Sequence, residues 1–478
     1  MEASSDERGR RKGGLITMPF IIGNEGFAKV ASTGLLPNMV LYLIGVYKLR
    51  LGKAANIIFL WYAASNFSPL FGAFVADSFL GRFLSIALGS IITFLGTALL
   101  WLTAMKPELR PSQSSATTSQ MAFLLTSLAL ISIGIGGISC SLPFGADQLN
   151  NKSNPNNQRV LESFIGCLFT GFAQVIVVAY KNRKLSLPPR NSAGNYHRRK
   201  GSDLLVPTNK LRFLNKACII KNPEQDITPD GSASNPWNLC TTDQVEELKA
   251  IIKVLPLWST SIMMSVSTSQ TSFRVLQAKT MNRHITPNFQ IPPGSFSSFM
   301  MFSIFVTVGI YDRIALPLAS RIAHKQVRIS AKTRIGIGLV FCVLDFIASA
   351  LIENKRRKKA IGEGFAENPN GVVDMSAMWL LVHHALMGMG EAFNAIGQSE
   401  FYYAEFPRTM SSIGSALYSL GMGVGNLMAS VIVNVVDGVS SRGGRESWVS
   451  DNLNKGRYDL YFWVLAGIES EFCVLFSL

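Results

Sequence analysis

The sequence carries little charge for its size. Of its 478 residues, 16% are Asp, Glu, Lys or Arg, whereas a soluble globular chain averages about 25%. Hydrophobic residues make up 48% of the chain, so there is too little polar surface to cover several soluble domains. The composition argues against a plain soluble enzyme and rules out an intrinsically disordered chain.

Cysteine and histidine are also scarce. The six cysteines are scattered, without a Cys-x-x-Cys spacing, so neither a structural zinc site nor a disulfide framework is expected. His383 and His384 are adjacent in the sequence, so we expect them to face apart on a helix and to bind no metal. No catalytic triad or pair of carboxylates indicates an enzyme, and we expect no cofactor.

Long apolar runs are abundant. Each can cross a hydrocarbon core of about 30 Å as a helix, and no alternating pattern indicates a membrane barrel. The ten runs are 28–48, 56–76, 83–104, 121–143, 247–268, 295–318, 334–353, 375–401, 409–436 and 458–478. The predicted fold class is therefore an all-α integral membrane protein with about ten transmembrane helices, embedded in a lipid bilayer.

The formal net charge is +15, and the excess of basic residues lies between apolar runs. This pattern is typical of cytoplasmic loops, so nucleic acid is not an expected partner. The segment 181–221 holds eleven basic residues and one acidic residue, Asp203, and is predicted to be a cytoplasmic linker. A further apolar run, Phe164 to Tyr180, has basic residues on both flanks, which favours an interfacial helix over a span.

A turn with a glycine, a carboxylate and an arginine ends the second run. Its sequence is GAFVADSFLGR, from Gly72 to Arg82, and it resembles the loop signature of major facilitator transporters. Glycine permits close approach of the helices. Asp77 and Arg82 are expected either to act in gating or only to shape this turn. The glycine clusters at 134–137 and 421–425 indicate helix packing rather than phosphate loops.

Several further motifs point to one family. They are KGGLITMPFII at 12–22, FGADQL at 144–149, CTTDQVEELK at 240–249, YDRIALPLASR at 311–321 and GQSEFYYAEFP at 397–407. Together they resemble the plant branch of the nitrate/peptide, or proton-dependent oligopeptide, transporter family. The resemblance implies a major facilitator fold with two six-helix bundles, a midplane site and alternating access.

The resemblance also implies partners and a location. The expected partners are protons and a substrate, either nitrate or a small organic solute such as a peptide, hormone or glycoside. The chain is expected to be a multi-pass protein of a plant plasma membrane. Substrate identity, transport direction and oligomeric state stay open.

The first helix of the family carries two glutamates and a basic residue. Here Glu25 and Lys29 remain, and Ala28 stands in place of the second glutamate. Glu25 and Lys29 are one helical turn apart, and an intramembrane ion pair is a functional candidate; the alternative is that both lie at the membrane edge. The resemblance assigns them to proton coupling and gating, although the loss of one carboxylate puts that coupling in question.

Substrate contacts are assigned in the same way. The resemblance places Glu400 in the substrate site, with Lys29 as its expected partner, and Thr268 and Gln270 on the cavity face of the seventh helix. Where the fourth helix of the family has a basic residue, this chain has Ser139 and no cation. Thr268 stands where a nitrate-transporting relative has histidine, so recognition of nitrate through histidine is not expected.

Two helices of the family have no counterpart here. After Leu161-Glu162-Ser163-Phe164 the chain passes almost directly into the segment that normally follows helix six. The predicted parts are a cytoplasmic tail and helix start (1–27), an incomplete four-span bundle (28–163), an interfacial helix with a basic linker (164–246) and a six-helix bundle (247–478). The alternative function is therefore a shortened, transport-incompetent membrane protein.

Overall fold

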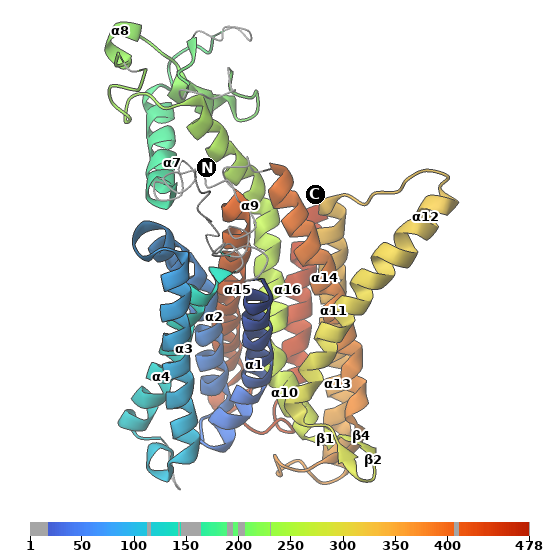
Figure 1. Ribbon diagram of the computed structural model, residues 1–478. Helices are drawn as coiled ribbons and strands as arrows, with labels where there is room; N and C mark the ends of the chain where they lie inside the picture. Colours follow the sequence, from blue (N-terminus) through green and yellow to red (C-terminus); the bar gives the residue numbers. More distant parts are fainter. Residues whose placement is uncertain are drawn as a thin grey trace, which may run out of the picture. The chain divides into compact units, whose positions relative to one another are not determined.

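Figure 1 shows a computed structural model, which describes residues 18–111, 116–141, 144, 164–188, 195–198, 206–229, 231–405 and 411–477. Contacts divide the chain into two compact units. The first unit comprises 1–153, 260–397 and 418–478, and the second comprises 154–259 and 398–417. Helices of both predicted bundles therefore belong to the first unit, and the predicted boundary at 246 falls inside a helix.

The first unit is built from long helices (Figure 1). They are α1 (Met18–Gly45), α2 (Leu51–Val75), α3 (Arg82–Met105), α4 (Thr118–Ile138), the later part of α9 (Thr242–Ser269), α10 (Thr271–Lys279), α11 (Ser298–Ile310), α12 (Leu316–Ile322), α13 (Ala331–Gly362) and α16 (Tyr458–Ser477), with most of α14 (Leu380–Glu405) and α15 (Ser411–Ser440). Short helical turns join them: η2 (Ala76–Leu80), η3 (Pro107–Leu109), η6 (Pro293–Ser297), η7 (Tyr311–Ala315), η8 (Ala377–Trp379) and η10 (Arg442–Gly444).

The helices confirm the predicted class of all-α membrane protein. In the described part of the chain, seven helical segments are long and apolar enough to cross a membrane. The other three predicted runs lie in α1, α14 and α16, which have 28, 26 and 20 residues. At 1.5 Å per residue, each of these also has the length of a span.

Local sequence signals explain two helix starts. Gly81 has φ +76°, a conformation that favours glycine, and it separates η2 from α3. Thr117 and Gln120 form a capping box at the start of α4, in which each side chain accepts a hydrogen bond from the other residue's backbone N–H. Both features fix where a membrane helix begins.

Glycines bring α2, α3 and α4 into close contact. A Cβ added to Gly72 would lie 2.0 Å from the carbonyl oxygen of Gly136, and one added to Gly134 would lie 2.6 Å from that of Gly89. In α15, a Cβ on Gly425 would lie 2.4 Å from the carbonyl oxygen of Ile262. The prediction that these glycines serve helix packing is confirmed.

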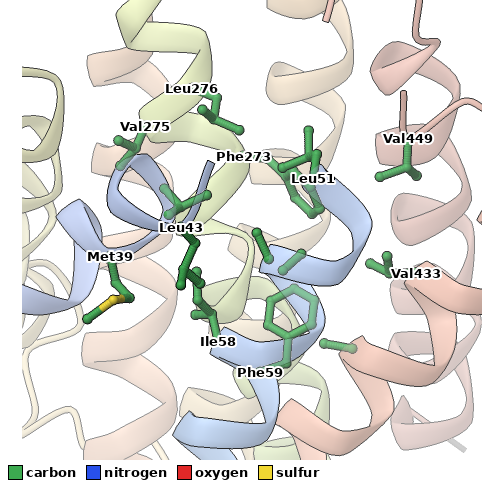
Figure 2. Close-up of a cluster of buried hydrophobic side chains, with 14 of the residues drawn as sticks. Met39, Leu43, Leu51, Ile58, Phe59, Phe273, Val275, Leu276, Val433 and Val449 are labelled. Atoms are coloured by element: carbon green, nitrogen blue, oxygen red, sulfur yellow. The ribbon is translucent and has the colours of Figure 1, made fainter. Parts of the chain in front are cut away.

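One hydrophobic core joins the earlier and later helices of the first unit (Figure 2). Leu43 of α1 and Phe59 of α2 are buried in the same cluster as Phe273 of α10 and Val433 of α15. The Phe59 and Phe273 rings meet edge to face, with centroids 6.5 Å apart. Helices α1 and α2 therefore share a packed interior with α10 and α15 inside the first unit.

Four short strands lie beyond the ends of the helices. Strand β1 (Met281–Asn282) pairs in parallel with β4 (Val373–Ser376), with a register irregularity between Met281 and Asn282. Strand β2 (His284–Thr286) pairs antiparallel with β3 (Phe289–Gln290). Strands of two to four residues leave the predicted all-α class unchanged.

The second unit gathers α7 (Phe164–Lys181) with part of the linker. It also contains η5 (Arg212–Cys218), α8 (Pro223–Asp226) and the start of α9. Val175 and Val178 of α7 pack with Leu214 and Cys218 of η5. The segment 164–181 is thus a helix with one face on the linker; its placement at the membrane surface stays a prediction.

Two thiols help to form the interior of the second unit. Burial raises the pKa of Cys218 and of Cys240 to about 12.

In the second unit, Lys253 of α9 also forms an ion pair with Glu405 of α14. This ion pair links α9 to the end of α14 within the second unit.

Candidate functional site

The predicted coupling residues lie on α1 and on the turn before α3. Glu25 and Lys29 fall one turn apart on α1, and Asp77 falls within η2; the side chains of all three lie outside the described part of the structure. Arg82 is the first residue of α3 and is partly exposed. The gating and coupling roles of these residues stay predictions based on the family resemblance.

The predicted substrate residues fall in different units. Glu400 lies on α14 in the second unit, where its side chain is exposed. Thr268 lies in the first unit, and its hydroxyl donates to the carbonyl oxygen of Ser265, 3.1 Å away on the same helix. These roles stay predictions based on the family resemblance.

Gln270 is engaged in helix packing. It is fully buried between α9 and α10. Its side-chain carbonyl accepts a hydrogen bond of 2.9 Å from the hydroxyl of Tyr461 on α16, and its amide donates to the carbonyl oxygen of Val266 over 3.0 Å. Gln270 therefore ties the junction of α9 and α10 to α16.

A buried ion pair that the sequence analysis missed lies between α10 and α13. A guanidinium N–H of Arg274 donates to the carboxylate of Asp345, and both side chains are 0% exposed. Ser267 donates a second hydrogen bond of 3.2 Å to the same carboxylate oxygen. Charged residues inside otherwise apolar helices were the available sequence signal.

Two histidines adjoin this pair. Nδ1 of His383 lies 3.8 Å from Oδ1 of Asp345. The expectation that His383 and His384 face apart is wrong, because their ring centroids are 4.0 Å apart. Neighbouring positions on a helix point in different directions at Cβ, but the side-chain torsions bring the two rings together. Among the described residues, no group of three or more His, Cys, Asp or Glu is placed to hold a metal.

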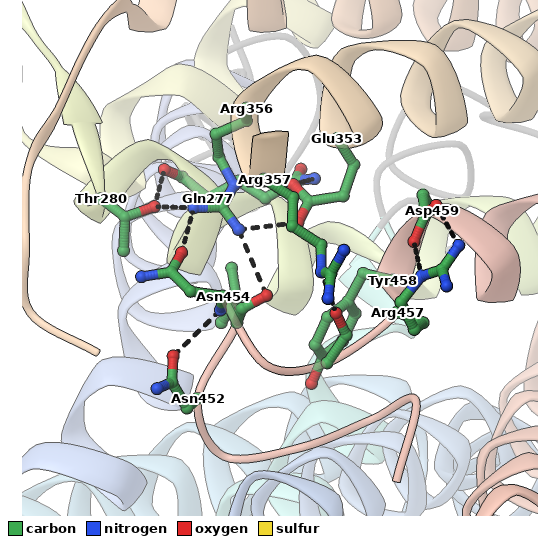
Figure 3. Close-up of polar contacts among 12 residues, drawn as sticks. Gln277, Thr280, Glu353, Arg356, Arg357, Asn452, Asn454, Arg457, Tyr458 and Asp459 are labelled. Carbon is green, nitrogen blue, oxygen red and sulfur yellow. Dashed lines mark hydrogen bonds and ion pairs between the residues drawn. The ribbon is translucent and has the colours of Figure 1, made fainter. Parts of the chain in front are cut away.

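A second buried polar cluster lies further along α13 (Figure 3). Arg356 donates to Glu353 over 2.8 and 2.7 Å and to the side-chain oxygen of Asn454 over 2.8 Å. Gln277 of α10 donates over 2.7 Å to Oε2 of Glu353, the oxygen that also accepts from Nε of Arg356. Since the charges are paired and hydrogen-bonded, this cluster holds α10, α13 and the segment before α16 together.

Polar contacts join α2 to the later helices. The amide of Asn56 donates to Asn434 of α15 over 2.7 Å, and Ser430 donates to Asn56 over 2.6 Å. At the start of α2, the backbone N–H of Leu51 donates to Asp451 over 2.5 Å. The end of the first unit that carries the turn between α1 and α2 is therefore closed by side-chain contacts.

The sequence profile of the POT family matches residues 83–184 and 169–449. The chain belongs to this family. It is 49% identical to Protein NRT1/PTR FAMILY 1.2 of Arabidopsis thaliana, over 97% of this chain and 89% of that protein. It is 39% identical to Protein NRT1/PTR FAMILY 1.3 of the same plant, over 96% of this chain and 93% of the relative.

A solved structure shares the fold. The POT family transporter PepTSo superposes with a TM-score of 0.64 at 17% sequence identity, over 98% of both chains. The family consists of transporters rather than enzymes, and this chain is accordingly a multi-pass membrane protein with the helical fold of POT transporters.

The alignments bear on the predicted internal deletion. The alignment with NRT1/PTR FAMILY 1.2 covers 538 residues, which exceeds the 478 residues of this chain, so that relative contains residues without a counterpart here. The two profile matches also overlap at 169–184, shortly after Phe164, where the two helices are predicted to be missing. The alignment with NRT1/PTR FAMILY 1.3 covers only 466 residues. This alignment is shorter than the present chain, so it does not indicate an additional segment in that relative.

Proposed function

We propose that this chain is a proton-coupled secondary transporter of nitrate or of a small organic solute, such as a peptide, hormone or glycoside, in the plasma membrane of a plant cell. The observation that carries the proposal is family membership over nearly the whole chain. The hydrophobic core shared by α1, α2, α10 and α15 supports it, because the two halves of the family fold are packed together.

The proposed coupling site is on α1. Glu25 accepts and releases the proton, and Lys29, one turn later, neutralises the carboxylate when the proton leaves. Asp77 and Arg82 flank the glycine turn between α2 and α3, where a change in backbone direction is already built in. In this proposal they stabilise one state of the gate by charge attraction.

The proposed substrate roles of Glu400, Thr268 and Gln270 are each carried over from the family resemblance, residue by residue. In this proposal Glu400, whose side chain is exposed, supplies negative charge to the substrate or to a salt bridge. The packing of Gln270 against Tyr461 gives this residue a positioning role: it fixes the end of α9, on which Thr268 lies.

Alternating access gives the contacts of α2 a role. With residues 1–27 cytoplasmic, the turn between α1 and α2 lies outside, and the contacts of Asn56 and Leu51 close the outer end. This arrangement is that of an inward-open or occluded transporter. Opening to the outside then requires that Asn56 separate from Asn434 and that Asp451 leave the start of α2.

The second candidate is a shortened, transport-incompetent membrane protein. The observation that favours it is the stretch of a relative with no counterpart in this chain. A bundle that lost two helices would fail if it exposed polar faces to lipid. The exposed faces of α3 and α4 are instead largely apolar and include Phe94, Trp101, Leu125 and Ile133, which favours the transporter.

Uptake in oocytes tests the proposal. Cells that express the chain are expected to accumulate one member of a panel of nitrate, a dipeptide, a plant hormone and a glycoside at acidic external pH. Glu400→Gln removes the charge without changing the size of the side chain and should reduce uptake to background. Glu224→Gln, an exposed change in the linker, is the matched control and should leave uptake unchanged. Surface expression without uptake of any of these solutes would favour the second candidate.

A further inference from the structure

A group of ionisable side chains lies buried among the later helices of the first unit, on elements other than α1. Its centre is the pair of Arg274 and Asp345, which carries no net charge when both groups are ionised. The proposed coupling through Glu25 makes no use of this group. Its chemistry therefore needs a separate account.

Glu469 lies on α16, which packs along α13, the helix that carries Asp345. The Glu469 side chain is 0% exposed, and neither carboxylate oxygen has a hydrogen-bond partner among the described residues. It lies close enough to Asp345 for the two carboxyl groups to interact electrostatically, because α13 and α16 pack along each other. The ionisable groups that face this cluster are Arg274 on α10, Cys342 and Asp345 on α13, His383, His384 and Glu391 on α14, and Cys473 on α16.

The charges can be assigned from these contacts. Arg274 and Ser267 both donate to Asp345, so Asp345 is the partner that carries the negative charge. Among the described residues of this cluster, Arg274 is the only lysine or arginine. A second carboxylate at Glu469 would be buried without a hydrogen bond to compensate for its lost hydration.

We propose that Glu469 is a second proton-binding group of this transporter, in a buried cluster with Asp345, Arg274 and His383. The inference rests on the proposed proton-coupled function and adds a carrier that the α1 motif does not supply. With Ala28 in place of a family glutamate, such a carrier restores a second titratable carboxyl group to the transport cycle.

The proton step involves one bond. An oxygen of Glu469 forms an O–H bond when a proton arrives from water, and the cluster then carries no net charge. Release returns the proton to water and leaves Glu469 and Asp345 both negative, with only Arg274 to offset them. Repulsion between the carboxylates of Asp345 on α13 and Glu469 on α16 then favours a conformation in which Glu469 reaches water.

Infrared difference spectroscopy on the full purified chain in lipid nanodiscs tests the assignment without requiring transport. Between neutral and alkaline pH, the wild type should lose a carbonyl band of a protonated carboxylic acid. Glu469→Gln should abolish that band. Glu471→Gln, at an exposed position two residues further along the same helix, should retain it. A band that persists in Glu469→Gln, or that disappears only in Glu391→Gln, would overturn the assignment.

The dependence of uptake on pH distinguishes a failure of the proposed transport function from a failure of the proposed role of Glu469. If the wild type takes up substrate, Glu469→Gln should flatten the dependence of uptake on external pH, whereas Glu471→Gln should keep the wild-type profile. An unchanged profile in Glu469→Gln would contradict the role of Glu469 in coupling. If the wild type shows no uptake at all, the proposed function fails, and the infrared band still decides whether Glu469 holds a proton.

Discussion

The guanidinium of Arg274 pairs with the carboxylate of Asp345 in the interior of the first unit, where both side chains are 0% exposed. The pair links α10 to α13, which are 71 residues apart at these positions. Each charge is tolerated only because the other is present, since a lone buried charge loses its hydration without compensation. This dependence can be measured.

Removing one partner should destabilise the protein strongly. Arg274→Met leaves Asp345 buried without its cation and should cost about 3–5 kcal/mol. The double variant Arg274→Met/Asp345→Leu removes both charges and should recover most of that loss. Thermal unfolding in detergent, followed by a thiol-reactive dye, measures the difference. A double variant that is less stable than either single variant would contradict the account.

The exposed pair of Arg50 and Asp451 supplies the control for that experiment. Its side chains are 82% and 52% exposed, so solvent screens the charges. Arg50→Met should therefore change stability by no more than about 1 kcal/mol. A loss as large as that of Arg274→Met would mean that burial does not decide the effect.

Gly72 should tolerate no side chain. A Cβ at this position would lie 2.0 Å from the carbonyl oxygen of Gly136, so Gly72→Ala must push α2 away from α4 and should cost about 1–3 kcal/mol. Gly309→Ala is the matched control, because no heavy atom lies within 4 Å of its added Cβ; it should be neutral or slightly stabilising. The melting temperatures of the two variants are compared, and equal values would contradict the close approach of α2 to α4.

Cys218 and Cys240 should react slowly with alkylating agents. Their pKa values of about 12 mean that at pH 8 only about one thiol in 10,000 is the reactive thiolate. Reactivity should rise as pH approaches 12 and after denaturation. Mass spectrometry of the protein after iodoacetamide treatment measures it, with Ser234→Cys as an exposed control in the same linker. Equal labelling of Cys218 and the control cysteine in the native protein would contradict the burial.

The contact between Asn56 and Asn434 should be broken during transport. A short bifunctional thiol reagent applied to Asn56→Cys/Asn434→Cys should link α2 to α15, because the two amides are 2.7 Å apart. The link should stop uptake, whereas the same reagent on Asn56→Cys alone should not. Full uptake by the linked protein would show that this end does not open.

Much of the helical architecture was predictable from the sequence. Apolar runs must form helices in lipid, because the backbone has no other partner there, and most of the described part of each run is helical. The packing role of Gly134 and Gly425 was predictable for a similar reason, since glycine in a membrane helix permits close approach.

The pairings between distant helices were not predictable. The partner of Arg274 lies on another helix, and no spacing in one sequence indicates which carboxylate it meets. The buried position of Gln270 against Tyr461 has the same origin, because helix rotation is set by packing. The close approach of the rings of His383 and His384 depends on side-chain torsions, which the helical period does not determine.

Proton-driven uptake by the purified chain tests the central claim most directly. The protein would be reconstituted into liposomes that contain a pH-sensitive dye, and the substrate found in oocytes would be added outside at acidic pH. The account predicts that substrate accumulates inside together with acidification of the lumen, and that both stop when an uncoupler removes the proton gradient. Substrate entry without acidification, or no entry above that of protein-free liposomes, would contradict proton-coupled transport by this chain.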